Sequence, residues 1–165
     1  MFLPMYPLDG TTVIKGELAK LRKAGISPIV VLTGCHSETL KLHLSHNNVI
    51  FIEDGEYREH SFEESLAIGL TGCAPLMERV LVLPVEYPAC ADSTIKELLA
   101  MEKSAIPTYK GQEGWPKSVI LSESEINLTE KINFDVETGS QILSTEDPGV
   151  TYSLQEEGGV ERITR

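Results

Sequence analysis

The stretch LRKAGISPIVVLTG, residues 21–34, decides the fold class because it joins the end of a helical pattern to a buried strand. Ahead of the strand, apolar residues recur at helical spacing over 11–24, and Gly25 predicts the end of that helix. The continuous apolar run 29–32 predicts a parallel strand covered on both faces. A helix followed directly by such a strand is the repeating unit of an α/β fold.

The same alternation continues along the chain. Ser61 and Glu64 have the spacing of a capping box and predict a helix over 61–70, and Thr94 with Glu97 predicts a second box. Further elements are predicted as follows: helices at 37–45, 92–101 and from Ser122, and strands at 49–52, 80–83, 106–110, 118–121, 142–143 and 150–154. We therefore expect one domain over residues 1–165, a three-layer α/β/α fold with a mostly parallel sheet.

Composition and net charge argue against several classes of function. The chain has 165 residues and a net charge of −11, so its surface repels phosphate backbones and general nucleic-acid binding is not expected. It contains no run of eighteen apolar residues, and its first ten residues lack the pattern of a signal peptide, so no membrane contact is expected. Three widely spaced cysteines fit buried thiols of a cytoplasmic protein rather than a disulfide framework.

Common phosphate and metal motifs do not occur in this sequence. Neither GxGxxG nor GxxxxGK[ST] follows any predicted strand. His43 and His46 are spaced to share a helix face near His36, but no carboxylate or cysteine completes a tetrahedral zinc set. Any nucleotide site in this chain therefore does not use either of these glycine-rich phosphate-binding motifs.

Five further segments carry a resemblance to a known family. They are PMYPLDGTTVI (4–14), VLVLPVEYP (80–88), STIKELL (93–99), PTYKGQEGWPKSVIL (107–121) and DPGVTYSLQEEGGVERI (147–163). Together with residues 21–34, and in this order, they resemble the MobA-like nucleotidyltransferases, which include molybdopterin cytidylyl- and guanylyltransferases. The resemblance implies a Rossmann-like fold of the nucleotide-diphospho-sugar transferase type. It also implies Mg²⁺ as cofactor, CTP or GTP as substrate, and nucleotidyl transfer to a phosphorylated acceptor such as molybdopterin.

The resemblance also points to candidate site residues. Glu86 stands where the family has a metal-binding Asp, and Gly34, Ser65, Gly114 and Trp115 match substrate-binding positions. Each has a plainer interpretation. Glu86 fits a solvated turn carboxylate, Gly34 a turn glycine at positive φ, and Ser65 an exposed or back-bonded helical serine. Likewise, Gly114 belongs to a turn, and Trp115 fits packing over a hairpin edge.

Departures from the family pattern fall on its catalytic parts. The family's opening strand and its AAG-x-S-x-R-M-G loop have no counterpart, and Leu3 and Gln155 replace a Lys and a late Asp. No residue is therefore assigned as catalytic. The sequence predicts a degenerate nucleotidyltransferase domain with weak or no catalysis. Two alternatives are an active Mg²⁺-dependent transferase that uses Glu86, and a non-enzymatic interaction module.

A missing opening strand has structural consequences. The strands at 28–32 and 80–83 would pair directly, accept residues 1–8 between them, or pair with a second copy in a homodimer. Each alternative is a prediction about strand pairing.

Overall fold

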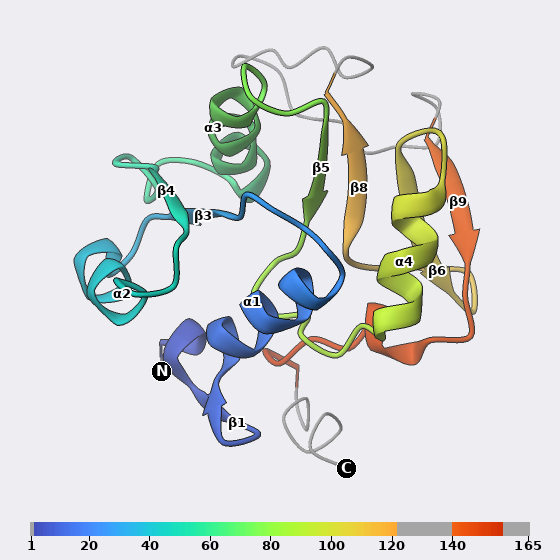
Figure 1. The fold of residues 1–165 in the computed structure, drawn as a ribbon, viewed down its shortest axis with the longest axis horizontal. Helices are drawn as coiled ribbons and strands as arrows, with labels where there is room; N and C mark the ends of the chain where they lie inside the picture. Colours follow the sequence, from blue (N-terminus) through green and yellow to red (C-terminus); the bar gives the residue numbers. More distant parts are fainter. Residues whose placement is uncertain (1, 122–139, 157–165) are drawn as a thin grey trace. The chain divides into compact units, whose positions relative to one another are not determined.

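The computed structural model describes residues 2–121 and 140–156, as drawn in colour in Figure 1. The chain divides into two compact units. Unit 1 comprises Met1–Ile26, Leu81–Val119 and Phe134–Arg165, and unit 2 comprises Ser27–Val80 and Ile120–Asn133. No helix within the described ranges combines the length and the apolar character that crossing a membrane requires.

Unit 1 begins with short elements and a long helix. The elements are η1 (Leu3–Met5), the antiparallel pair β1 (Pro7–Leu8) and β2 (Thr11–Thr12), and α1 (Val13–Lys23). Helix α1 ends where Gly25 takes a φ of +81°, which confirms the predicted helix end. The unit also contains α4 (Asp92–Ala100) and η3 (Pro148–Val150).

The larger sheet has the order β5-β8-β6-β7, with β9 also paired to β6. Its strands are β5 (Arg79–Val82), β6 (Ala105–Tyr109), β7 (Gln112–Glu113), β8 (Lys117–Ile120) and β9 (Gln141–Ser144). β6 pairs antiparallel with β7 and β8 and parallel with β9. This sheet is therefore mixed, whereas a mostly parallel sheet was expected.

Unit 2 contains a parallel strand pair and two helices. β3 (Val30–Thr33) pairs in parallel with β4 (Ile50–Glu53), and α2 (Ser37–His43) connects them. α3 (Phe62–Cys73) packs on this pair through glycines, because a Cβ on Gly69 would lie 3.2 Å from Leu32 Cδ2. A Cβ on Gly72 would likewise lie 2.5 Å from Ile52 Cδ1, so the second half of α3 packs closely on both β3 and β4.

Two local predictions for helices have opposite outcomes. The Ser61 capping box is confirmed: Ser61 Oγ accepts from Glu64 N at 3.2 Å, and Glu64 Oε2 accepts from Ser61 N at 2.6 Å. The Thr94 box is wrong, since α4 begins at Asp92 and Thr94 Oγ1 donates to Asp147 instead. The Thr94 hydroxyl therefore donates to a residue distant in sequence and does not cap the helix as the local pattern predicted.

Other predictions need correction. Residues 150–154 form no strand, because Val150 closes the η3 turn and its carbonyl accepts from Trp115 N. Residues 7–8 pair with 11–12 in a separate two-stranded sheet and do not lie between the strands at 30–33 and 79–82. Among the described strands, 30–33 pair with 50–53 and not with 79–82. Of the cysteines, Cys35 is exposed, so it is not a buried thiol. The helix expected from Ser122 lies outside the described residues.

Candidate functional site

The loop between β5 and α4 follows the carboxyl end of a strand, where open α/β sheets bind ligands. Long-range contacts within unit 1 hold its backbone. Lys20 Nζ donates to the carbonyl oxygens of Pro88 and Cys90, the latter at 2.7 Å. Leu154 N donates to Glu86 O at 2.8 Å. Helix α1 and the segment around 154 therefore fix the path of this loop.

Asp147 anchors the far end of the same loop. Its Oδ2 accepts from Ala91 N at 2.8 Å and from Thr94 Oγ1 at 2.7 Å, while its Oδ1 accepts from Gly149 N at 2.9 Å. This carboxylate lies at the start of α4 and accepts from the amide of its N-cap residue, Ala91. It acts as a structural cap supplied from far along the chain.

Two carboxylates belong to this loop and the helix beside it. Glu86 is half-buried in the loop, and Glu17 is buried on α1. Burial raises the pKa of Glu17 to about 8, Lys20 opposes this rise, and the charge of Glu86 adds to it. Carboxylate oxygens are the donors that Mg²⁺ and Mn²⁺ prefer, and Glu17 Oε1 is a buried oxygen without a hydrogen-bond partner among the described residues. The donor set at this loop therefore fits a divalent cation.

Trp115 and Gly114 lie beside this loop. The Trp115 ring lies 6.3 Å from the Tyr87 ring, tilted by 40°, and Lys117 Nζ lies 4.6 Å from its centroid. A Cβ on Gly114 would lie 2.3 Å from Val150 O, so the backbone approaches too closely for any other residue. The structure gives both residues packing roles and places them near Tyr87, the neighbour of Glu86.

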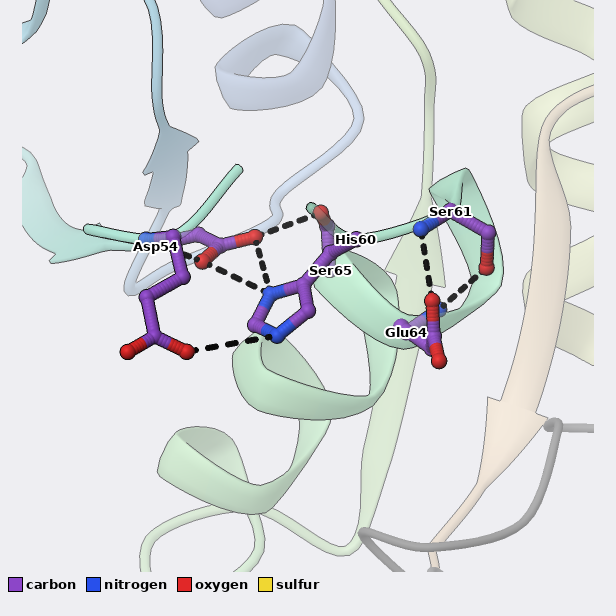
Figure 2. Close-up of polar contacts among 6 residues, drawn as sticks. Asp54, His60, Ser61, Glu64 and Ser65 are labelled. Carbon is purple, nitrogen blue, oxygen red and sulfur yellow. Dashed lines mark hydrogen bonds and ion pairs between the residues drawn. The ribbon is translucent and has the colours of Figure 1, made fainter. Parts of the chain in front are cut away.

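A separate polar cluster follows β4 in unit 2 (Figure 2). Asp54 is 3% exposed and directly follows the strand. Its carboxylate accepts from Ser65 Oγ at 2.6 Å and from Glu56 N at 3.0 Å, and each of its oxygens lies 3.0 Å from His60 Nδ1. The other imidazole nitrogen, Nε2, lies 3.8 Å from Glu56 Oε2.

The charges in this cluster stabilise one another. Burial raises the pKa of Asp54, but the hydrogen bonds from Ser65, His60 and the Glu56 amide outweigh it and lower the pKa overall. The hydrogen bond to Asp54 raises the pKa of His60, and burial opposes this only in part. A carboxylate holding Nδ1–H of a protonated imidazole ties the residues between β4 and α3 together. The cluster therefore orders this connection.

The remaining predicted residues also lie in unit 2. Gly34 follows β3, and its φ is not positive, so the turn-glycine interpretation is wrong. A Cβ there would lie 2.6 Å from Tyr57 Cβ, which explains the glycine by close packing. Ser65 is neither simply exposed nor back-bonded, because its hydroxyl donates to Asp54.

Sequence reasoning missed several residues of these sites. Asp54 carried a usable signal, since a carboxylate directly after a predicted strand lies where ligands bind. Glu17 also carried one, because a charged residue stood on the apolar face of a predicted helix. Lys20 and Asp147 carried no local signal, because their partners lie 68 and 56 residues away.

Comparison with known proteins identifies a family for most of the chain. The family model described as MobA-like NTP transferase domain matches residues 4–147. No curated protein sequence matches the chain.

Solved structures with low sequence identity share the fold. A nucleotidyl transferase from Methanothermobacter is 18% identical with a TM-score of 0.78, covering 98% of this chain and 83% of its own. The manganese complex of Rv0371c from Mycobacterium tuberculosis is 14% identical with a TM-score of 0.75, covering 98% and 90%. Molybdopterin-guanine dinucleotide biosynthesis protein A from Archaeoglobus fulgidus is 13% identical with a TM-score of 0.63, covering 99% and 89%. These matches show an α/β nucleotidyltransferase fold.

Proposed function

Because the chain belongs to the MobA-like NTP transferase domain family, we propose that it binds a nucleoside triphosphate with a divalent cation and transfers the nucleotidyl group weakly or not at all. The acceptor class is a phosphorylated small molecule such as molybdopterin, and the nucleotide is CTP or GTP. The name of the Archaeoglobus protein supports this acceptor class by likeness of fold.

Glu86 is the residue proposed to hold the cation. It follows β5, and its carboxylate is the kind of hard donor that Mg²⁺ and Mn²⁺ take. When bound, such a cation neutralises phosphate charge and orients the reacting groups. The manganese complex among the similar folds supports a divalent cation of this class.

The weak-transfer proposal rests on the hydrogen bonds that the ammonium group of Lys20 makes. Nucleotidyl transfer needs positive charge placed against the triphosphate before the reaction. Lys20 is the cation of α1 nearest the β5–α4 loop, and its ammonium group donates to Pro88 O and Cys90 O instead. For scale, removing one hydrogen-bond donor that stabilises transition-state charge costs about 2.7–4 kcal/mol, or about 10²–10³ in rate.

A thermal-shift panel with CTP, GTP, ATP and UTP, with and without Mg²⁺, tests nucleotide binding. A ligand at about 100 times its Kd adds about 2.7 kcal/mol of stability, which corresponds to several degrees for a chain of this size. We expect a selective, Mg²⁺-dependent rise for CTP or GTP. A flat panel at millimolar nucleotide would contradict the proposal and favour the interaction module.

Pyrophosphate release with CTP or GTP, Mg²⁺ and molybdopterin tests catalysis. We expect release close to background. The second candidate function, an active transferase, is favoured by the half-buried position of Glu86 after β5. It predicts robust release that Glu86→Gln abolishes, and the exposed Glu97→Gln on α4 is the matched control.

A further inference from the structure

Glu17 is a buried carboxyl group for which the fold described so far provides no role. The residue is 6% exposed, and its Oε1 atom is fully buried without a hydrogen-bond partner among the described residues. A polar atom buried in this way costs free energy unless a proton, water or cation completes its environment. The atom therefore points to an occupant that protein groups do not supply.

The neighbours of Glu17 on α1 show where its side chain points. Residues at spacings of three and four share one face of a helix, so Val13, Glu17 and Lys20 lie on the same side of α1. Val13 belongs to a core cluster with Leu3 and Leu154, against which Val85 packs. Near Val13, where α1 begins, this face of the helix therefore lies close to Val85 of the β5–α4 loop.

The other end of this face meets the loop further along. Lys20 donates to the carbonyl oxygens of Pro88 and Cys90. Glu17, one turn before Lys20 and one turn after Val13, consequently faces the part of the loop between residues 85 and 88. Glu86 lies in that part, and its charge acts on Glu17.

The chemistry at this point favours a cation. Glu17 and Glu86 come from different elements, and the charge of Glu86 together with burial disfavours the ionised form of Glu17. The charge of Lys20 acts on Glu17, but the ammonium group of Lys20 donates to the carbonyl oxygens of Pro88 and Cys90, and Glu17 Oε1 has no partner among the described residues. A divalent ion that prefers oxygen ligands would bind the unpartnered Oε1 of Glu17 and favour the ionised form of its carboxyl group.

We propose that Glu17 and Glu86 together bind one divalent cation of the Mg²⁺ or Mn²⁺ class, with Glu17 as a ligand contributed by α1. The inference rests on the proposed function in one respect, because Glu86 is the cation ligand in both. It adds a specific residue, and a binding step that occurs without nucleotide.

Titration of the full chain with Mn²⁺ alone, followed by the loss of the free-ion EPR signal, tests the inference. We expect one site, and at least a roughly 10-fold weaker Kd in both Glu17→Gln and Glu86→Gln, because each removes a carboxylate from the ion's surroundings. Glu97→Gln, an exposed position on α4, should bind as the wild type does. Unchanged binding in Glu17→Gln would overturn the inference, as would the absence of a site in the wild type.

A second measurement needs no variant and covers the case in which Glu17→Gln fails to fold. Bound Mn²⁺ broadens NMR signals of nearby nuclei, so the amides of residues 16–18 and 86–87 should broaden first. Broadening at 86–87 without any at 16–18 would exclude Glu17 as a ligand. Because neither measurement uses nucleotide, their failure leaves the thermal-shift result on the proposed function intact.

Discussion

At the scale of single residues, several glycines are explained by contacts across the fold. Gly114 and Gly149 each bring one backbone against another, and a Cβ would lie 2.3 Å from Val150 O or 2.1 Å from Ala89 O. Gly16, inside α1, has space, since its nearest contact would be Thr11 Cγ2 at 3.8 Å. Glycine is therefore required at positions 114 and 149, whereas at position 16 it lowers the stability of the helix relative to alanine.

Two glycine substitutions should change stability in opposite directions. Gly114→Ala should lower the free energy of unfolding by more than about 1 kcal/mol, because a backbone atom cannot move away cheaply. Gly16→Ala should raise it by about 0.5–1 kcal/mol, because alanine loses less backbone entropy in a helix. Urea unfolding of both variants measures the difference. Equal effects would show that the close approach at Gly114 is not a constraint.

At the scale of elements, two sets of hydrogen bonds hold the connection from β4 to α3 in unit 2. Ser61 and Glu64 cap the helix reciprocally, and Ser65, one residue later, reaches back to Asp54 (Figure 2). Local capping and a tertiary polar cluster thus act on adjacent residues of one helix start. Different hydrogen bonds make up the two contributions, so separate substitutions test them, while the charge of Glu64 also acts on His60.

The cap should have a measurable effect by itself. Ser61→Ala removes the acceptor for Glu64 N and should cost about 1 kcal/mol of stability. Ser93→Ala, at an exposed position in the first turn of α4, is the matched control and should cost almost nothing. Urea unfolding compares the two. Similar losses would contradict a capping role for Ser61.

The Asp54–His60 pair should make stability depend on pH with a defined sign. The pKa of His60 is raised above its ordinary 6.5, so its contribution is complete below that pH and is lost as pH rises through the folded value. The pKa of Asp54 is lowered below 3.8, so its contribution is present above that pH and is lost as pH falls through the folded value. Both contributions are therefore present between about pH 4 and 6.5.

His60→Gln is the variant that tests this dependence. Its destabilisation, measured by urea unfolding, should be larger at pH 5.5 than at pH 8.5, since only the lower pH retains the charged pair. His46→Gln in the segment after α2 serves as the control. A destabilisation that does not change with pH would rule out a charged His60 in the folded state.

At the scale of the whole molecule, the two compact units share strands. β5 and β8 each contribute residues to both units, so unfolding of one unit would break strands of the other. We therefore expect one cooperative unfolding transition. The fluorescence of Trp115, the single tryptophan, and far-UV circular dichroism should give coincident midpoints. Separate midpoints would instead support independent units and contradict the single-domain prediction.

The sequence alone determined the elements whose signals are local. The apolar run at 29–32, the Ser61 cap and the stop at Gly25 predicted β3, α3 and the end of α1 to within a few residues, because near neighbours carry those interactions. The order of the motifs also predicted the family. Ser65 as a substrate-binding residue stays a prediction from the resemblance, and its hydrogen bond to Asp54 was not predicted.

The tertiary structure decided the contacts that join distant segments. Thr94 donates to Asp147 and not to a local cap, and residues 150–154 form turns and not a strand, because partners from elsewhere in the chain outcompete local preferences. The same holds for Glu17, whose burial and orientation depend on how α1 meets the β5–α4 loop. Packing of this kind depends on all the elements together, and so no single stretch of sequence encodes it.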